Sequence, residues 1–405
     1  GNFTLRIPAN AQTLQVSFVG MKTQEIPIEG RTIINVIMEE DVQTLEELVV
    51  VGYGVQKKAH VTGSVAQIDS KELMVAPMTT ISNLLTGKLP GLISKQTAGT
   101  PGADQATLLI RGFGTYNDSS PLLVVDGVPR NFNTLDPSDI ESVTILKDAA
   151  AAAVYGVRAA HGVILVKTKR GKPDKKPTLN YTGSLTFSKN TRFPTFLNGP
   201  DYAIWHNKAR ELDGNEGYFS EEDLNKIINN DPEGIFGNTD WINAVFKDHG
   251  SINQHNLSVN GGSNNTQYFI SGGFMDQEGI IPNSAFKRYN VRSNIDVKLN
   301  NEFKASLDLS GRYNKTRLPG VNIDTPHHGY SPITQAIRAL PIIPEIYNEL
   351  PTATGEGSRT YNPVAAANLS GFQDKKQYFF DSGATLEYDA PFLEGLSAKI
   401  FASYD

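Results

Sequence analysis

The sequence predicts a small α/β domain followed by a long antiparallel sheet of the kind that forms membrane-spanning β-barrels. Residues 108–170 alternate apolar strands, glycine turns and one helical stretch. From Thr178 the pattern changes to strict alternation of apolar and polar residues, which gives each strand one apolar face. The segments between these strands are alternately short and long, as in barrels whose turns face one side of a membrane and whose loops face the other.

The composition narrows the classes of function. The chain has 405 residues, a formal net charge of −6 and no cysteine. The acidic balance does not indicate a nucleic-acid-binding surface. The lack of cysteine excludes disulfides, thiolate zinc sites and cysteine nucleophiles within this sequence. No apolar run is long enough for a transmembrane helix, but hydropathy averaging hides membrane-spanning strands.

The α/β domain is predicted to span residues 55–172. Val124 and Val125 lie in an apolar run that ends at Asp126-Gly127, a turn pair. Residues 148–153 are helix formers and precede Gly156, a residue suited to end a helix. Residues 162–168 are β-branched and predict a buried strand.

Four motifs of this domain, in a fixed order, are more specific than its composition. They are Ile110-Arg-Gly112, Val125-Asp-Gly-Val-Pro129, Asp139-Ile-Glu-Ser-Val-Thr-Ile-Leu-Lys-Asp148 and Tyr155-Gly-Val-Arg-Ala-Ala-His-Gly-Val-Ile-Leu-Val-Lys-Thr168. Together they resemble the plug domain of TonB-dependent outer-membrane transporters of the SusC/RagA type, found in Bacteroidetes. The family usually has Gly-Ala-Asn-Gly where this chain has Ala159-Ala-His-Gly162, a local departure. The resemblance implies an α+β plug domain inside a transmembrane antiparallel β-barrel.

The first residues predict a small β-rich extension. Short strands are expected at 3–7, 14–18, 24–28 and 33–38, separated by Pro, Gly and Asn. A generic piece of a β-sandwich would show the same pattern. The position ahead of the plug implies, by resemblance, that residues 1–41 are part of a carboxypeptidase-regulatory-like β-sandwich extension.

A linker at 42–54 joins the extension to the plug and ends in a β-prone run. An unpaired strand of this kind can be bound by addition to the edge of another sheet. In the family this position holds the TonB box, which pairs with the periplasmic energy-coupling protein TonB. The resemblance implies this role for Glu47, Leu48, Val49, Val50, Val51, Gly52 and Tyr53. The alternative is an ordinary first strand of the plug.

Residues 173–405 are predicted to be the first part of the barrel, preceded by the partial sandwich and the plug. Alternation places about seven strands at 178–189, 254–260, 268–274, 288–299, 303–313, 380–388 and 396–404. Aromatic residues cluster near strand ends on the apolar face, as in interfacial girdles: Tyr181, Phe187, Tyr268, Phe274, Phe303, Tyr313, Tyr388 and Tyr404. The connections 190–251 and 314–376 are expected to be long extracellular loops. Seven strands cannot close a large barrel, and an open sheet edge is not tolerated in lipid, so we expect this sequence to be part of a longer protein.

Two kinds of site residue are expected. Arg111 follows an apolar strand, and a buried arginine needs a carboxylate, so Arg111 is predicted to lock the plug to the barrel wall. Arg158 is a second candidate, with pairing inside the plug as the alternative. The aromatic residues Tyr116, Trp205, Trp241 and Tyr330 are candidate contacts for substrate or for a lid. Packing within the loops is the alternative for such residues.

No catalytic arrangement is visible in the sequence, so an enzyme, a cofactor and a metal site are not expected. The resemblance implies TonB-coupled import of oligosaccharides or oligopeptides across the outer membrane, with outer-membrane lipid around the barrel. It also implies a SusD-like surface lipoprotein as a lid. The alternatives are a signal-transducing receptor with little transport, siderophore- or cobalamin-type uptake, and a soluble β-rich adhesin.

Overall fold

The described residues form two separate units in a computed structural model. They are residues 4–5, 12–16, 24–28, 30–38, 48–51, 54–57, 64–73, 79–116, 118–229, 231, 233–321, 323, 331–354, 361–393 and 395–405. The first unit comprises residues 1–62 and the second residues 63–405.

The first unit contains two short hairpins. Strand β1 (Thr13–Val16) pairs antiparallel with β2 (Gln24–Pro27), and β3 (Leu48–Val51) pairs antiparallel with β4 (Gly54–Lys57). The strands predicted near 14 and 24 are therefore confirmed. The strand predicted at 33–38 is wrong, because these residues are described and irregular. A short alternation without a partner edge does not specify a strand.

The second unit begins with the α/β domain, residues 64–172, called the plug below. Its main sheet has the order β5-β10-β11-β8-β9, in which β8 and β11 are parallel and the other pairs are antiparallel. The strands are β5 (Val65–Asp69), β8 (Leu122–Val125), β9 (Val128–Pro129), β10 (Ile140–Leu146) and β11 (Val163–Thr168). A separate hairpin joins β6 (Leu92–Gln96) and β7 (Ala106–Ile110).

Short helices surround these strands. They are α1 (Ser70–Leu73), α2 (Ile81–Leu84), α3 (Ala149–Ala152) and the 3-10 helices η2 (Phe132–Thr134), η3 (Pro137–Asp139) and η4 (Ala153–Ala159). The Asp148 carboxylate caps α3 by accepting from the Ala151 N–H (2.8 Å). Gly156 has φ 66° and breaks the helical path, as the sequence predicts. The plug core is apolar and includes Leu73, Phe132 and Ile145, all fully buried.

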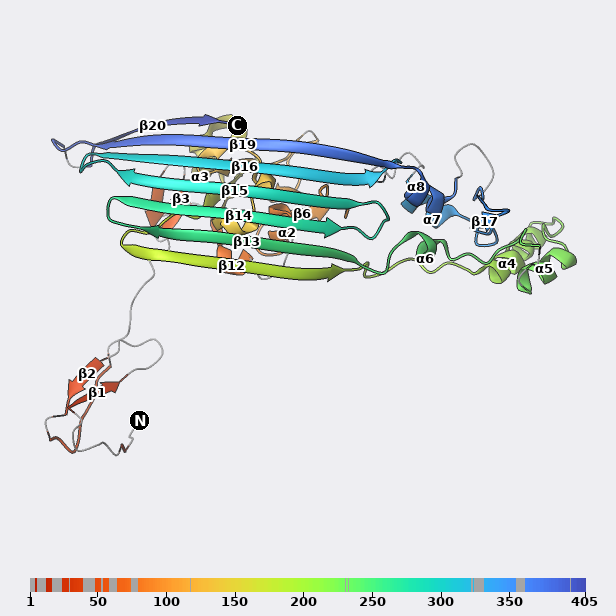
Figure 1. The fold of residues 1–405 in the computed structure, drawn as a ribbon, viewed down its shortest axis with the longest axis horizontal. Coiled ribbons are helices and arrows are strands. Elements are labelled where there is room, and N and C mark those ends of the chain that lie inside the picture. Colours follow the sequence, from red (N-terminus) through yellow and green to blue (C-terminus); the bar gives the residue numbers. More distant parts are fainter. Residues whose placement is uncertain are drawn as a thin grey trace. The chain divides into compact units, whose positions relative to one another are not determined.

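The rest of the second unit is a seven-stranded antiparallel sheet in chain order, called the wall below (Figure 1). Its strands are β12 (Lys175–Ser188), β13 (Gly250–Gly262), β14 (Thr266–Glu278), β15 (Ala285–Lys298), β16 (Phe303–Pro319), β19 (Phe372–Asp389) and β20 (Ser397–Tyr404). The seven predicted strands are thus confirmed. Short turns lie at one end of the sheet and long connections at the other (Figure 1), as predicted.

The two strands that extend farthest beyond their predicted ends are β16 and β19. β16 has 17 residues and β19 has 18, so the outer connection begins at 320 and ends at 371 instead of running from 314 to 376. The added residues include the outward pair Arg317 and Asp374, joined at 2.8 Å. Strands can continue past the apolar band into water, where charged side chains are stable, so charge did not mark the strand end.

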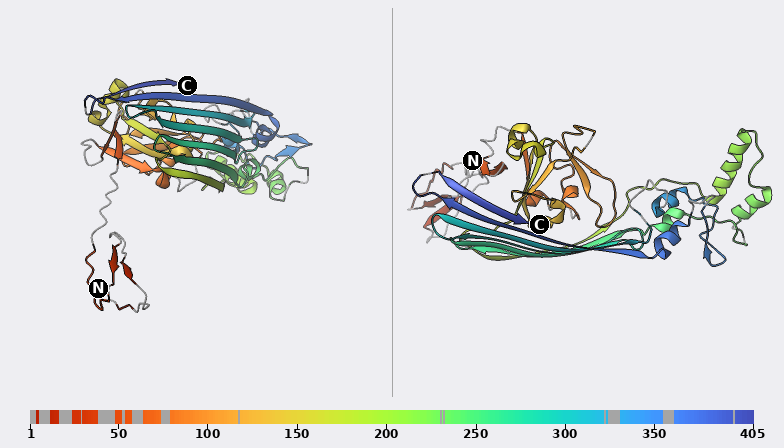
Figure 2. Two further views of the ribbon diagram at one scale, coloured as in Figure 1. Left: turned by 60° about the vertical axis from the view of Figure 1, so that its left-hand side comes forward. Right: turned by 90° about the horizontal axis from the view of Figure 1, so that it is seen from above.

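The wall has an inner and an outer face. Seen from above, the wall is curved and the plug lies on its concave side (Figure 2). On β15 the inward Arg288, Arg292 and Asn294 are buried, whereas the outward Tyr289 and Val291 are about half exposed. The outer face has an aromatic row across neighbouring strands with ring centroids 4.9–6.5 Å apart: Tyr181, His255, Phe274, Tyr289, Tyr313 and Tyr378. A row of aromatic rings on the outward face is typical of strands that meet lipid.

The long connections fold into a loop layer beyond one end of the wall (Figure 1). It contains α4 (Gly199–Leu212), α5 (Glu221–Ile228), α6 (Trp241–Val245), α7 (Pro332–Arg338), α8 (Pro363–Leu369) and the hairpin of β17 (Ile346–Tyr347) and β18 (Leu350–Pro351). The two connections share apolar clusters, one around Trp241 and Ala336 and one around Phe219 and Ile342. Ser220 and Asp223 form a capping box on α5. Within the described residues, no helix is long and apolar enough to cross a membrane.

Candidate functional site

The plug meets the wall along a polar interface. Three arginines of the wall face inward: Arg288 and Arg292 on β15 and Arg312 on β16. Arg288 is 2% exposed and Arg292 is 4% exposed. Cations buried this deeply need carboxylates or carbonyl oxygens, and the plug supplies both. The contact surface therefore depends on individual charged groups in addition to apolar packing.

Arg288 forms the most deeply buried ion pair among the described residues. Its Nη2 lies 2.9 Å from Asp136 Oδ2, and the two side chains are 2% and 1% exposed. Its Nη1 donates to the Thr79 carbonyl oxygen (3.1 Å). The second Asp136 oxygen accepts from the Ser138 N–H (2.9 Å), so the same carboxylate caps η3 and binds the wall. Loss of either partner would leave an uncompensated buried charge.

A second carboxylate of η3 also contacts the wall. Asp139 Oδ1 accepts from the Ser271 hydroxyl of β14 (2.6 Å). Burial, reinforced by the neighbouring Asp136 carboxylate, raises the pKa of Asp139 to about 6. Ser271, Arg292 and Lys169 act in the opposite direction. The interface therefore contains a carboxyl group that titrates near neutral pH.

The C-terminal end of the plug makes a third set of contacts. Asn294 Nδ2 donates to Thr168 Oγ1 (2.9 Å) and to the Lys169 carbonyl oxygen (2.8 Å). Arg170 binds Asp296 of β15 (2.7 Å) and Asp308 of β16 (2.6 Å). Charge-assisted bonds of this length are stronger than neutral ones, so this end of the plug is firmly joined to the wall.

The turn between β8 and β9 connects these contacts to Arg292. Asp126 has φ 49° and is followed by Gly127 with φ 86°, which bends the chain sharply. The Asp126 carboxylate accepts from the Thr168 N–H (2.9 Å) and the Thr168 hydroxyl (2.7 Å). Arg292 Nη1 lies 3.8 Å from its Oδ2. Thr168 thus stands between Asp126 of the plug and Asn294 of the wall.

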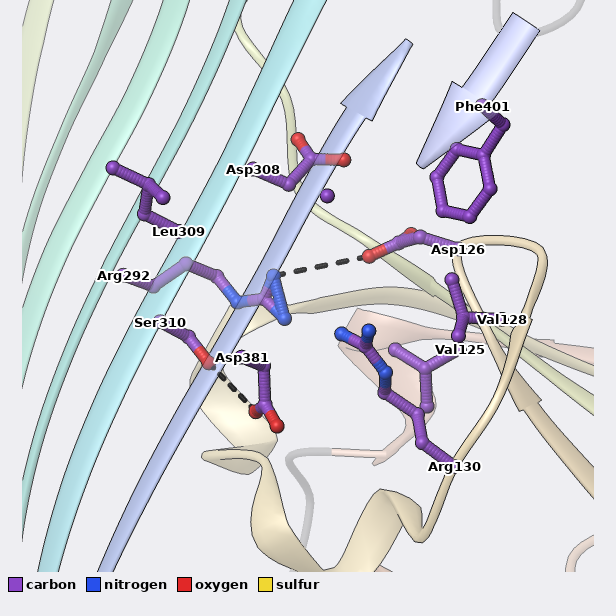
Figure 3. Close-up of a pocket in the computed structure, with 11 residues that line it drawn as sticks. Val125, Asp126, Val128, Arg130, Arg292, Asp308, Leu309, Ser310, Asp381 and Phe401 are labelled. Carbon is purple, nitrogen blue, oxygen red and sulfur yellow. Dashed lines mark hydrogen bonds and ion pairs between the residues drawn. The ribbon is translucent and has the colours of Figure 1, made fainter. Parts of the chain in front are cut away.

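A charged hollow lies beside this turn (Figure 3). Arg292 points from the wall toward Asp126, and Asp381 of β19 accepts from the Ser310 hydroxyl (2.9 Å) (Figure 3). The residues that line the hollow are Val125, Asp126, Val128, Arg130, Arg292, Asp308, Leu309, Ser310, Asp381, Gly383 and Phe401. The hollow lies between the β8–β9 turn of the plug and strands β15, β16, β19 and β20 of the wall.

A plug turn packs against the loop end of the wall. Gly102 has φ 76°, and a side chain there would overlap the Phe286 ring of β15. Phe286 belongs to an apolar cluster with Ile252 and Met275. Only glycine fits this close approach in this backbone conformation.

Comparison with known proteins identifies this architecture. The family model described as "TonB-dependent Receptor Plug Domain" matches residues 57–163. The TonB-dependent receptor SusC of Bacteroides thetaiotaomicron is 36% identical over 73% of this chain, and TonB-dependent receptor P3 of Formosa agariphila is 33% identical over 98% of it. A solved structure of the RagAB peptide importer in an open-open state has a TM-score of 0.71 at 26% identity over 88% of this chain.

The chain belongs to the SusC/RagA group of TonB-dependent receptors. It is accordingly an outer-membrane protein, and the predicted fold class of a plug domain with part of a β-barrel is confirmed. The chain spans 38% of the P3 receptor, 28% of SusC and 42% of the RagAB chain.

The arginines that join the plug to the seven described wall strands differ from the two predicted locks. Arg111 and Arg158 are both exposed, and neither forms an ion pair among the described residues. Arg111 has φ 60° and lies just after β7, so the chain turns there and its side chain leaves the apolar strand. Among the described residues Arg170, Arg288 and Arg292 make the plug–wall contacts, and the role of Arg111 and Arg158 as locks stays a prediction.

The four candidate aromatic contacts of the receptor have different surroundings. Trp241 is 3% exposed, and its Nε1 donates to the Leu340 carbonyl oxygen (3.0 Å), so it packs within the loop layer and is not available to a ligand. Trp205 is 62% exposed on α4, and Tyr116 of the plug is fully exposed. Tyr330 lies outside the described residues.

In the TonB-box segment, Leu48–Val51 form β3, while Glu47, Gly52 and Tyr53 lie outside the described residues. The wall arginines were predicted only as members of polar strand faces. A sequence signal for them exists: an arginine among small polar residues, on a strand whose other face is apolar, indicates a charged group that faces the interior and needs a partner there. Their partners are distant in sequence, with Asp136 152 residues from Arg288, so no local pattern links them.

Proposed function

We propose that this receptor imports nutrients across the outer membrane and that TonB supplies the energy by pulling on the plug. The observation that supports this most directly is the nature of the plug–wall contact. The plug has its own apolar core, whereas several discrete ion pairs and hydrogen bonds bind it to the wall. A domain attached in this way can shift or partly unfold without dissolving the wall, because the wall strands retain their own ladder.

The point of force entry is residues 47–53, the proposed TonB box. Among the described residues, β3 pairs only with β4, so its other edge is available for an added strand. Backbone pairing with TonB along this edge needs no particular side chain. The assignment of residues 42–54 to a linker, of 1–41 to a carboxypeptidase-regulatory-like extension and of 55–172 to the plug belongs to the same proposal.

Strand β5 is the first plug element on this path. Among the described residues it is an edge strand that pairs only with β10, over five residues. Its N-terminal end is clamped because the Asp148 carboxylate accepts from the Ser64 N–H and the Lys147 N–H donates to the Ser64 carbonyl oxygen (3.2 Å). The contacts to the wall lie at the opposite end of β10, near Asp139. Tension applied at Ser64 therefore loads the β5–β10 pair before the wall contacts.

Oligosaccharides and oligopeptides are the proposed cargo classes. SusC is a relative, and a structural neighbour is described as a peptide importer. These likenesses support both classes and do not separate them.

We also propose a SusD-like lipoprotein as a lid on the loop layer. On α4, Trp205 (62% exposed) and Leu212 (78%) lie seven residues apart on the same side of the helix, and Ile204 (46%) is exposed beside Trp205. Apolar side chains at this density are typical of a protein contact. Trp205 is our candidate anchor for the lid.

A signal-transducing receptor is the second candidate. The observation that favours it is the independent first unit, residues 1–62, which precedes the plug. Such a unit could pass binding at the outer face to a periplasmic regulator. In that case the receptor would bind cargo with little import.

The test is import by cells that carry the full-length gene with residues 47–53 deleted. Labelled glycan and peptide mixtures are supplied, and surface expression and cargo binding are measured in parallel. We expect the deletion to abolish import while surface expression and cargo binding stay normal. The labelled mixture that enters cells with the intact receptor, but not cells with the deletion, identifies the cargo class. Unchanged import would refute the TonB-box assignment, and binding without import in the intact receptor would favour the signalling function.

A further inference from the structure

The three inward arginines of the wall differ in their partners. Arg288 pairs with Asp136 at 2.9 Å, and Arg292 lies 3.8 Å from Asp126. Arg312, also partly buried, has no carboxylate within ion-pair distance among the described residues. A partly buried guanidinium without a counter-ion is costly, so its presence needs a reason.

The groups in direct contact with Arg312 are neutral, whereas the charged Arg288 and Asp381 interact with it at longer range. Its Nη1 donates to the Asn133 carbonyl oxygen of the plug (3.2 Å), and its Nε is buried without a hydrogen-bond acceptor. On the same inner face, Asn314 lies one inward position along β16 and has a buried Oδ1 without a partner. Gln377 of β19 is directly opposite Asn314 in the strand register. Two amides thus lie next to an uncompensated cation.

An aromatic ring fixes the orientation of this cation. The guanidinium carbon of Arg312 lies 4.2 Å from the centre of the Phe379 ring, and Phe379 is opposite Arg312 in the register. Stacking on a ring holds the planar guanidinium while its edge stays free to donate. Asp381, the next inward residue of β19, accepts from the Ser310 hydroxyl and lines the hollow of Figure 3. Asp381 interacts with Arg312 only at longer range and forms no ion pair with it among the described residues.

We propose that Arg312, with Asn314 and Gln377, binds an anionic group of the cargo on the inner face of the wall. The group is a planar carboxylate, supplied either by an acidic sugar or by a peptide. A guanidinium matches a carboxylate with two parallel hydrogen bonds, and neighbouring amides bind the hydroxyl or amide groups of either cargo. This inference rests on the proposed import function and adds a charge preference to it.

Arg317 offers a matched control on the same strand. It also stacks on a ring, with its guanidinium carbon 4.2 Å from the centre of Phe372. It differs because it binds both oxygens of Asp374 (2.8 and 2.9 Å). A change at Arg317 therefore removes a stacked arginine of β16 whose charge is already compensated.

The test is calorimetric binding to the full-length receptor in detergent. The probes are hexagalacturonate against neutral maltohexaose, and an acidic hexapeptide against the same peptide with its carboxyl groups amidated. We expect the receptor to bind one anionic probe at least tenfold more tightly than its neutral counterpart, and the pair that shows this identifies the source of the carboxylate. Arg312→Gln should remove this preference, a loss of about 10- to 100-fold for a charge-assisted hydrogen bond.

The variants separate binding from a merely structural role. Arg312→Lys keeps the charge and should retain part of the preference, together with a Kd that weakens as salt is raised. Arg317→Gln should bind as the unchanged receptor does. Equal binding of every charged and neutral pair, or an unchanged preference in Arg312→Gln, would overturn the inference. TonB dependence is measured separately, by import. If the receptor shows the charge preference but still imports cargo after deletion of residues 47–53, the proposed TonB coupling is refuted and the inference about Arg312 is not.

Discussion

Asp136→Asn is the substitution that should most weaken the attachment of the plug to the wall. The change keeps the shape of the side chain but removes the charge that compensates Arg288, whose side chain is 2% exposed. Breaking one partner of a buried pair costs about 3–5 kcal/mol. Arg288 keeps its bond to the Thr79 carbonyl oxygen, so we expect the lower end, about 3 kcal/mol.

Hydrogen exchange of the full-length receptor in detergent measures this cost. Amides of η3 and of the first residues of β10 should exchange about 100-fold faster, since each 1.4 kcal/mol is about tenfold. The double variant Arg288→Met with Asp136→Leu should recover most of the protection, because an apolar pair of similar volume replaces a buried ion pair at little cost. Protection in Asp136→Asn within threefold of the unchanged receptor would refute the reasoning.

The control for this experiment lies on α4. Lys208 and Glu211 form an ion pair at 3.1 Å, and both side chains are more than half exposed. Lys208→Gln should change local protection by less than about 0.5 kcal/mol, because exposed pairs of this type contribute little.

Three further outcomes are expected. Trp241→Ala should cost about 3–5 kcal/mol of local stability, seen as faster exchange in 332–343, since the ring is 3% exposed and joins the two outer connections; Trp205→Ala, at a site 62% exposed, should leave exchange there unchanged. Gly102→Ala should displace the plug turn and cost about 1–3 kcal/mol of local stability, because Gly102 has φ 76° and the added carbon would meet the Phe286 ring. Unchanged exchange protection in β15, the strand of Phe286, would contradict this. The pKa of Asp139 is raised to about 6 from about 3.9 in the unfolded chain, so the folded plug binds this proton more tightly. The attachment of the plug should therefore strengthen by about 1 kcal/mol as the pH falls from 7 to 5. Hydrogen exchange corrected for intrinsic rates measures this change, and Asp139→Asn should remove the pH dependence.

The strands of the wall could be predicted because their alternation reflects a physical boundary between lipid and a polar interior. Tyr289 and Val291 alternate with Arg288 and Arg292, and the structure places the first two outward and the last two inward. The ends of the strands could not be predicted in the same way. Arg317 and Asp374 satisfy each other across two strands, so their charges do not stop the sheet.

The plug–wall contacts were inaccessible to sequence reasoning for a different reason. Arg111 lies next to an apolar strand in the sequence, but burial depends on the backbone turn at φ 60°. Asp136 and Asp139 lie just before strand β10, and no local pattern marks either as a contact to the wall. Their function depends on Arg288 and Ser271, more than 100 residues away, which only the fold brings into contact.

The most direct test of the account is import through a receptor whose plug is tethered to its wall. Asp139 and Ser271 are in hydrogen-bond contact (2.6 Å), and these 405 residues contain no cysteine, so Asp139→Cys with Ser271→Cys adds one thiol on each side of the interface. If the plug must leave the wall for cargo to pass, oxidation of this pair should abolish import of labelled cargo, and a reducing agent should restore it, while each single variant imports under both conditions. Undiminished import by the fully oxidised double variant would contradict the central claim.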